Sequence, residues 1–458
     1  MKFLSLLVAV LPLASAAAVS PPKRAITPAN DPFYVPPVGF ESSKPGTVLR
    51  DRRIIASFFG LIPQPIDARQ LLYRTTAIDG SAIATVTTIF RPAFAKNDRF
   101  ISYNTAYDSA ATICNPSYGY RLGSLQTDLI SSAEYLLIQG YLLSGYTVIS
   151  ADYEGPEAAF AAGRMSGMGV LDSMRAVINY GSNIGHINKN PMIVNAGYSG
   201  GAIAGGWAAS LHPTYAPELN VKGWILGGTP ANLSAVIDYV DGGLVAGFLP
   251  GAISGLSKPS AYGKQLQPLI DRVATPHGKQ IIASGGTQCV IYNLATFAGK
   301  SILDTSIQSF GKDLLNQPEI ISILINTTMG FKKEETPTAP VMLYHAPDDE
   351  VIPYAPSVAL GKTWCDNGAD VRFTTYGAGG HITTEAVAIV DALKFANDAF
   401  NGRVPGGCSS NSVLTNKLDP LALGLDLEPV LARLALLLIK LGDKDGNWLK
   451  SISSGQVL

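Results

Sequence analysis

The chain has 458 residues with 34 basic and 35 acidic side chains, and charged residues make up 15% of it. This near-neutral balance argues against nucleic-acid binding, which calls for an excess of positive charge. The chain is long enough to bury a large core, and one α/β domain with insertions is the natural expectation.

The N-terminal residues are typical of a secretory signal sequence. Lys2 is followed by an apolar stretch at 4–13 and an A-x-A cleavage pattern, so residues 1–16 are expected to be removed. The stretch is too short to span a bilayer, and no transmembrane segment is expected. The pair Lys23-Arg24 resembles a dibasic propeptide site within the N-terminal segment 17–34. The alternative is that these residues are two exposed charges with no role in processing. We therefore expect a secreted, extracellular protein.

The predicted strands follow one another in an alternating β/α order. Two early segments, 70–76 and 81–91, alternate apolar and polar residues and predict a pair of strands. Short apolar runs predict buried parallel strands at 100–104, 146–151, 192–196, 223–226, 340–344 and 371–375. Helical stretches lie between them, which predicts a doubly wound, mostly parallel α/β core formed by residues 35–230 and 339–405.

A serine stands where one of these strands turns into a helix. The run 192–196 leads into Gly197-Tyr198-Ser199-Gly200-Gly201, which fits G-x-S-x-G, and a helix-like stretch follows at 202–210. This order predicts a nucleophile elbow that holds Ser199 above the sheet. In a chain with 46 glycines the alternative is an ordinary Gly-Ser turn. The strand before the serine and the small-residue helix after it favour the elbow.

One interval in the alternation is too long for a crossover connection. About a hundred residues separate the strand ending near Gly228 from the strand beginning at Pro340, far beyond ordinary loops. An insertion after the carboxyl end of a strand lies above the active site, so residues 231–338 are expected to form a cap or lid. A second independent domain is the alternative. A cap with apolar faces suits long acyl chains or an oil–water surface.

A serine at such an elbow needs a general base and an acid to form a catalytic triad. In triads of this kind the residues follow one another along the chain in the order serine, acid, histidine, so the base is expected late in the chain. Among the five histidines, His381 follows the strand-like 370–375 and a glycine-rich loop, and it precedes the helix-like 383–400. His345 competes, but it ends an apolar run and is expected to line a wall. The other three precede the acid candidates: His186, His212 and His277. We assign the base to His381.

The acid is expected after the strand 340–344. Asp348, Asp349 and Glu350 stand side by side there, so position alone does not choose among them. The block 349–353 resembles the D-x-x-V/I-P turn of many hydrolases, in which the leading Asp binds the histidine. We choose Asp349, with Asp348 as the alternative. Its role is to hold His381 in the required tautomer and to stabilise the imidazolium.

Further strings resemble the fungal secretory lipase family of the α/β-hydrolase superfamily. They are Asp-Tyr-Glu-Gly at 152–155, Gly-Tyr-Ser-Gly-Gly-Ala at 197–202, Tyr-Ala-Pro-Glu-Leu-Asn at 215–220 and Gly-Gly-Thr-Pro at 227–230. The resemblance extends over most of residues 35–405. It implies a triad of Ser199, Asp349 and His381.

The resemblance also implies an oxyanion hole made by two backbone amides, those of Gly200 and Asp108. No H-G-G-G segment is present, so the second amide must come from another loop, and the loop after 100–104 is a sensible source. A plain loop residue is the alternative reading of Asp108. In this family the C-terminal segment forms a flap, so residues 406–458 are expected to form a flap or tail. The apolar run at 431–441 is too short to span a bilayer; a helix packed on the body is expected, with an interfacial role as the alternative.

Secretion gives the four cysteines a structural meaning. In an oxidising compartment they are expected to form two disulfides, with three pairings open. The family resemblance implies Cys114 with Cys289 and Cys365 with Cys408. Two sequons, at Asn232 and Asn326, are candidate glycosylation sites.

Together these features imply a secreted serine carboxylic ester hydrolase, foremost a triacylglycerol lipase that forms an acyl-enzyme. An esterase or deacetylase of a small secondary-metabolite ester is one alternative, and an acyltransferase with the same triad is another. A third alternative is a non-enzymatic binding protein that has kept the elbow without its activity, but the intact triad argues against this. No metal-ligand or nucleotide-binding spacing is found, so no cofactor is expected. The protein is expected to be a monomer. Its expected partner is a lipid or other ester substrate at an oil–water interface.

Overall fold

The structure, a computed structural model, describes residues 24–125 and 128–414. The expected signal sequence and the apolar run at 431–441 lie outside these ranges. Among the described residues, none of the helices combines the length and the apolar character that crossing a membrane requires.

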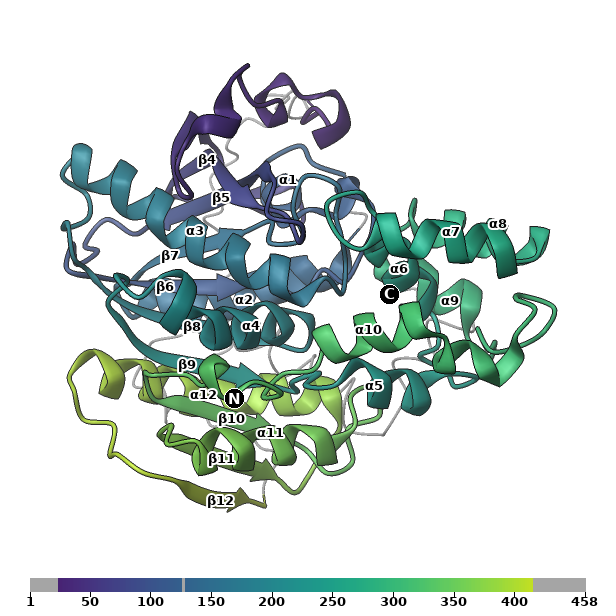
Figure 1. Ribbon diagram of the computed structural model, residues 1–458. Helices are drawn as coiled ribbons and strands as arrows, with labels where there is room; N and C mark the ends of the chain where they lie inside the picture. The colour runs from purple at the N-terminus through teal and green to yellow at the C-terminus, as the bar shows by residue number, and fades with distance from the viewer. Residues whose placement is uncertain (1–23, 126–127, 415–458) are drawn as a thin grey trace, which may run out of the picture.

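One ten-stranded sheet forms the centre of the described part of the chain (Figure 1). Its strands are, in spatial order, β1 (Val48–Ile54), β4 (Asp67–Thr76), β5 (Ala82–Arg91), β7 (Thr147–Ala151), β6 (Arg99–Asn104), β8 (Met192–Tyr198), β9 (Val221–Gly227), β10 (Val341–His345), β11 (Val371–Tyr376) and β12 (Ser409–Val413). A separate short hairpin pairs β2 (Ser57–Phe58) with β3 (Ile62–Pro63).

The direction of the strands decides where a site can form. All pairings from β7 to β12 are parallel, whereas β1, β4 and β5 pair antiparallel with their neighbours. Strands β7 and β10 are buried along their whole length, as expected of parallel strands covered on both faces. The carboxyl ends of the parallel strands meet at one edge of the sheet, where ligands bind in open α/β folds.

Helices cover both faces of the sheet (Figure 1). On one face α3 (Gly163–Asn183), α4 (Gly200–Tyr215) and α11 (Tyr354–Asp366) pack through residues such as Met174, Trp207 and Trp364. On the other face α2 (Leu129–Leu143) and α12 (His381–Phe400) pack through Tyr141 and Phe395. The short helix α1 (Pro116–Gly119) lies in the loop after β6.

A group of helices lies beyond one end of the strands, beside the sheet rather than on its faces (Figure 1). They belong to the long interval between β9 and β10: α5 (Leu233–Val240), α6 (Phe248–Leu256), α7 (Gly263–Val273), α8 (Pro276–Gly285), α9 (Val290–Phe297) and α10 (Pro318–Asn326). We call them the inserted helices. Their own core joins the body of the protein, because it includes Val351 and Ile352 from the loop after β10.

Two strands of the sheet were not among the predicted ones. Strand β1 has the sequence VLRDRRI and is partly exposed, and β12 has the sequence SSNSV and is largely exposed. They lie at the two edges of the sheet, where only one neighbouring strand is present. Because β12 pairs in parallel with β11, the sheet extends beyond residue 405, into the region expected to be a tail.

Candidate active site

Ser199 lies at the sharp turn between β8 and α4, with φ 51° and ψ −120°. Residues other than glycine rarely adopt this strained conformation. A Cβ atom on Gly197 would lie 2.4 Å from the carbonyl oxygen of Gly201, and one on Gly201 would lie 1.9 Å from the carbonyl oxygen of Asn104. The turn is that of a nucleophile elbow. It places Ser199 at the N-terminus of α4, where the helix dipole favours negative charge.

Asp349 and His381 are joined by a hydrogen bond. Nδ1 of His381 lies 2.7 Å from Oδ2 of Asp349, although 32 residues separate them. The other carboxylate oxygen accepts hydrogen bonds from the amides of Val351 at 2.9 Å and Ile352 at 2.7 Å. Asp348, the alternative acid, is exposed to solvent. The loop after β10 therefore directs the buried Asp349 towards the histidine.

Contacts of its backbone and ring hold His381 beside the elbow. The hydroxyl of Tyr198 donates a hydrogen bond of 2.7 Å to the His381 carbonyl, and the two rings lie 4.9 Å apart between centroids. The His381 amide donates to Glu350 Oε2 at 2.9 Å. Burial lowers the pKa of His381, but the charge and hydrogen bond of Asp349, together with the charges of Glu350 and Glu385, raise it above its ordinary value.

His345 also contacts the acid, a role that its sequence position did not reveal. Nε2 of His345 lies 3.2 Å from Oδ2 of Asp349, and both side chains are fully buried. Burial raises the pKa of Asp349, but the charges and hydrogen bonds of His381 and His345 outweigh it and hold the pKa below its ordinary value. The side chain expected to line a wall thus contacts the candidate acid.

Asp108 packs directly on Gly200. It lies in the loop after β6 with φ 42°, an uncommon conformation for a residue with a side chain. A Cβ atom on Gly200 would lie 1.6 Å from Oδ1 of Asp108, so only glycine fits there. The structure therefore brings together the two residues expected to form the oxyanion hole. Oδ1 of Asp108 is buried and has no hydrogen-bond partner among the described residues.

Several acidic side chains that were not among the predicted site residues gather behind Asp108. They are Asp128, Glu134, Glu154 and the partly buried Glu385. Burial and the charge of Asp128 raise the pKa of Asp108 to about 7. Burial raises the pKa of Asp128 and of Glu385 to about 7 as well. Burial and neighbouring carboxylates raise the pKa of Glu134 and Glu154 well above the usual range.

An apolar cavity of about 100 Å³ adjoins the serine. Its wall contains Ser199, Gly200 and Asp108 on one side. The inserted helices contribute apolar side chains on the other side, among them Val236, Phe248, Leu249 and Ile253. A second apolar cavity of about 120 Å³ lies within the inserted helices. The two adjoin, because they share the wall residues Ile237, Ile253, Leu256, Ile302 and Leu324.

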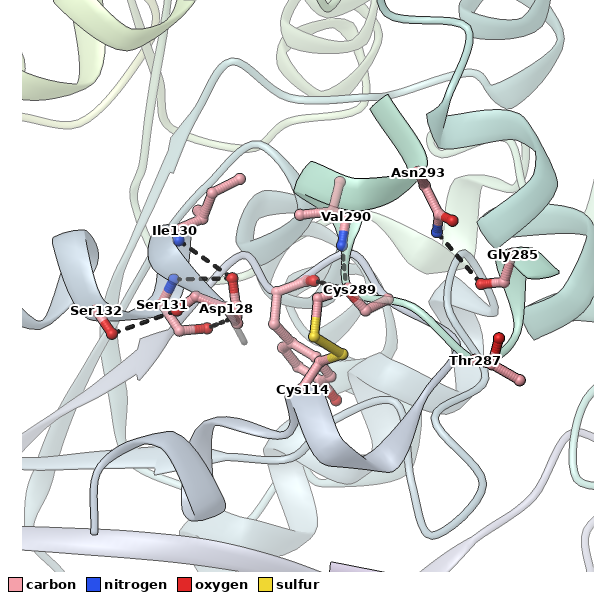
Figure 2. The surroundings of a disulfide bond; sticks show 12 residues. Cys114, Asp128, Ile130, Ser131, Ser132, Gly285, Thr287, Cys289, Val290 and Asn293 are labelled. Atoms are coloured by element: carbon pink, nitrogen blue, oxygen red, sulfur yellow. Dashed lines mark hydrogen bonds between the residues drawn. A yellow bond between two sulfur atoms is a disulfide. The ribbon is translucent and has the colours of Figure 1, made fainter. Parts of the chain in front are cut away.

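Two disulfides bind outlying segments to this site. Cys114, in the loop that carries Asp108, is bonded to Cys289 immediately before α9 (Figure 2). Cys365 at the end of α11 is bonded to Cys408 immediately before β12. This is the pairing that the family resemblance implies, and no described cysteine is free.

The remaining candidate residues lie apart from Ser199, Asp349 and His381. Asn232 caps α5, since its side-chain oxygen accepts hydrogen bonds from the amides of Ser234 and Ala235. Asn326 is the last residue of α10 and is partly exposed. The other histidines serve no visible role at the site: His186, His212 and His277.

Known proteins resemble this chain along most of its length. A family model described as secretory lipase matches residues 121–407. Secreted triacylglycerol lipase LIP1 of Malassezia furfur is 39% identical over 399 residues, which cover 86% of this chain and 80% of that protein. The closed state of Candida antarctica lipase A is similar in structure, with a TM-score of 0.80 and 30% identity over 90% of this chain and 96% of that one. The esterase LipA of Xanthomonas oryzae, at 15% identity and a TM-score of 0.56 over 79% of this chain and 98% of that one, shares the fold. The chain therefore has the α/β-hydrolase fold and belongs to the secretory lipase family.

Proposed function

We propose that the protein is a secreted triacylglycerol lipase in which Ser199, His381 and Asp349 form the catalytic triad. The observation that carries this proposal is the Asp349–His381 hydrogen bond beside a strained serine in the wall of an apolar cavity. Relatives named as secreted triacylglycerol lipases support both the substrate class and the location.

The first half of the proposed reaction acylates the serine. Because Nδ1 of His381 donates to Asp349, Nε2 is the free nitrogen and takes the proton of Ser199 as its hydroxyl oxygen attacks the ester carbonyl. Asp349 stabilises the imidazolium, and the two backbone amides that donate hydrogen bonds to Asp349 hold it in position. The leaving alcohol then takes the proton from His381, and an acyl-enzyme remains.

The oxyanion of each tetrahedral intermediate needs hydrogen-bond donors. We assign this role to the backbone amides of Gly200 and Asp108, because the Asp108 side chain packs directly on Gly200. The N-terminus of α4 adds a favourable dipole. In the second half of the reaction His381 activates water, which attacks the acyl carbon and releases the fatty acid.

The substrate proposal rests on the two adjoining cavities. Their walls are mostly apolar, and the second extends the first away from Ser199 into the inserted helices. An acyl chain that enters both leaves water and gains the free energy of apolar burial, about 0.8 kcal/mol per CH₂ group. The inserted helices thus act as a cap that binds the acyl part of a long-chain ester.

The setting that we propose is the surface of a lipid droplet or emulsion. The interval between β9 and β10 exposes large side chains at Tyr239 and Tyr292 in the inserted helices and at Leu244 between α5 and α6, which are between 45% and 55% exposed. Such residues favour contact with an oil–water interface. We expect the protein to act there as a monomer.

Replacement of Ser199 by alanine tests the chemistry. We expect kcat for p-nitrophenyl butyrate to fall by several orders of magnitude, while the midpoint of thermal unfolding stays within a few degrees of the wild type. Turnover near that of the wild type would refute the proposed triad.

A series of esters tests the substrate class. We expect kcat/KM to rise from acetyl to long-chain p-nitrophenyl esters, and emulsified triolein to be hydrolysed. Hydrolysis that stops at butyryl esters would refute the lipase assignment in favour of an esterase for small substrates.

A further inference from the structure

The peptide group between Tyr107 and Asp108 carries one of the two amides that we assign to the oxyanion. A peptide group is planar and trans, so its carbonyl and its N–H point in opposite directions. Whatever holds the Tyr107 carbonyl therefore fixes the direction of the Asp108 N–H. The φ of 42° at Asp108 makes such support necessary, since a strained residue keeps its conformation only when its surroundings impose it.

The side chain of Ser109 holds this carbonyl. Its hydroxyl donates a 2.5 Å hydrogen bond to the Tyr107 oxygen, and Ser109 is fully buried. The same hydroxyl oxygen accepts a hydrogen bond of 3.0 Å from the amide of Val290. A serine hydroxyl has a single proton. Because Val290 occupies the oxygen as a donor, the proton of Ser109 is directed to Tyr107.

Val290 belongs to the inserted helices and is held at this place. It is the first residue of α9, where a backbone N–H has no partner within the helix. The preceding residue, Cys289, is bonded to Cys114 of the loop that carries Asp108, as Figure 2 shows. The covalent bond and the hydrogen bond together attach the start of α9 to the Asp108 loop.

The ring of Tyr107 is anchored separately. Its hydroxyl accepts a 2.8 Å hydrogen bond from the Glu154 amide, and the ring packs against Tyr153 at 5.0 Å between centroids. Removal of the Ser109 hydroxyl would therefore release the peptide group without releasing the side chain of Tyr107.

We propose that Ser109 is a positioning residue for the oxyanion hole, and that the Val290 amide makes this positioning depend on the placement of the inserted helices. The path runs from the Val290 N–H to the Ser109 hydroxyl and from there to the Tyr107 carbonyl, whose peptide partner is the Asp108 N–H. This inference rests on the proposed function, because it takes Asp108 as an oxyanion donor.

The first test is Ser109→Ala. Removal of an oxyanion-hole donor lowers kcat by about 100- to 1000-fold. Ser109→Ala keeps the Asp108 amide but lets its peptide group rotate, so we expect a smaller loss of kcat, about 10- to 100-fold. KM for p-nitrophenyl butyrate should change by less than about threefold, because the ground-state ester binds through apolar contacts. Affinity for a trifluoromethyl ketone, which forms an oxyanion with Ser199, should fall in parallel with kcat. The matched control is Ser357→Ala in α11, which removes another buried hydroxyl, one that has no hydrogen-bond partner in the described part of the chain.

The second test separates the amide of Val290 from its side chain. Val290→Pro removes the N–H at the first position of a helix, where proline is well tolerated, and Cys289 has the extended conformation that precedes proline readily. Val290→Ala keeps the N–H and loses only methyl groups. We expect the proline variant to lower kcat several-fold and the alanine variant to leave it within about twofold of the wild type.

These outcomes separate the two proposals. If Ser199→Ala is inactive but Ser109→Ala keeps the wild-type kcat, the positioning role is wrong and the triad stands. Equal losses of kcat in Ser109→Ala and Ser357→Ala, or in the two Val290 variants, would also overturn the positioning role. If Ser199→Ala remains active, the proposed function itself fails.

Discussion

Nε2 of His345 lies 3.2 Å from Oδ2 of Asp349, the oxygen that also accepts the hydrogen bond of His381. The same nitrogen lies 3.1 Å from the carbonyl oxygen of Ile352. Two imidazoles and two backbone amides therefore surround the carboxylate. The orientation of Asp349 does not depend on its bond to His381 alone, and it is set before a substrate arrives.

The two histidines should differ sharply in their effect on catalysis. Replacement of His381 by alanine removes the proposed base and should lower kcat by about 10⁴-fold or more. His345→Phe removes a contact to the charged Asp349, worth about 1.5–3 kcal/mol, together with the contact to the Ile352 carbonyl, and leaves His381 in place, so kcat should fall by about 10- to 100-fold. His345→Gln, which keeps a donor, serves as the control and should lose less. If the His381 variant were more active than the His345 variant, the base would have to be assigned to His345 instead.

The pH dependence of activity should follow the raised pKa of His381. Burial opposes its protonation, but Asp349, Glu350 and Glu385 favour it more strongly, so the pKa exceeds the ordinary 6.5. Since the base must be neutral, kcat/KM should rise with pH and reach half its maximum above pH 6.5. Glu350→Gln removes one negative charge and should move this midpoint to lower pH. A wild-type midpoint at or below 6.5 would contradict the prediction.

Stability should fall as the pH rises from about 4 to about 7. Burial raises the pKa of Asp108, Asp128 and Glu385 to about 7, so the folded state binds more protons than the unfolded state in this window. Their contribution is complete below the unfolded pKa, about 4, and is lost as the pH rises through the folded pKa. The lowered pKa of Asp349 acts in the opposite sense, since its contribution is lost only as the pH falls below that window.

Asp128→Asn isolates one of these carboxyl groups. Asp128 caps α2 by accepting hydrogen bonds from the amides of Ile130 and Ser131, and asparagine keeps an oxygen for this purpose. We expect the unfolding temperature of the variant to match the wild type at pH 4.5 and to exceed it by a few degrees at pH 7.5. Equal differences at both values would show that the charge is not responsible.

The Cys365–Cys408 disulfide should support the loop that carries His381. Strand β12 follows Cys408, and Val413 at its end accepts a hydrogen bond of 2.8 Å from the amide of Gly377, four residues before His381. Replacement of both cysteines by alanine should let β12 fray. We expect kcat to fall several-fold at temperatures where circular dichroism still reports a folded protein. Activity that declines only together with the far-ultraviolet signal would contradict this role.

The elements that position the elbow could be predicted from the sequence because they are local. A run of buried apolar residues specifies β8 wherever it lies in the sheet, and Gly197 and Gly201 are needed for the turn itself. The order of serine, acid and histidine along the chain then limits the partners. The edge strands β1 and β12 escaped prediction because one edge of each strand faces solvent and polar residues are tolerated there. Their sequences therefore show neither a buried apolar run nor an alternation of apolar and polar residues.

The amino-acid sequence thus determined the type of fold, the family, and Ser199 and His381 of the proposed triad, and it narrowed the acid to Asp349 with Asp348 as the alternative. Only the tertiary structure decided that Asp349 rather than Asp348 faces His381, that His345 contacts the same carboxylate, and that Ser109 joins the Asp108 loop to α9. These contacts link residues on different loops at the carboxyl ends of parallel strands. Their partners are set by how the strands align side by side and where each loop turns. A pattern of single residues along the chain does not record either.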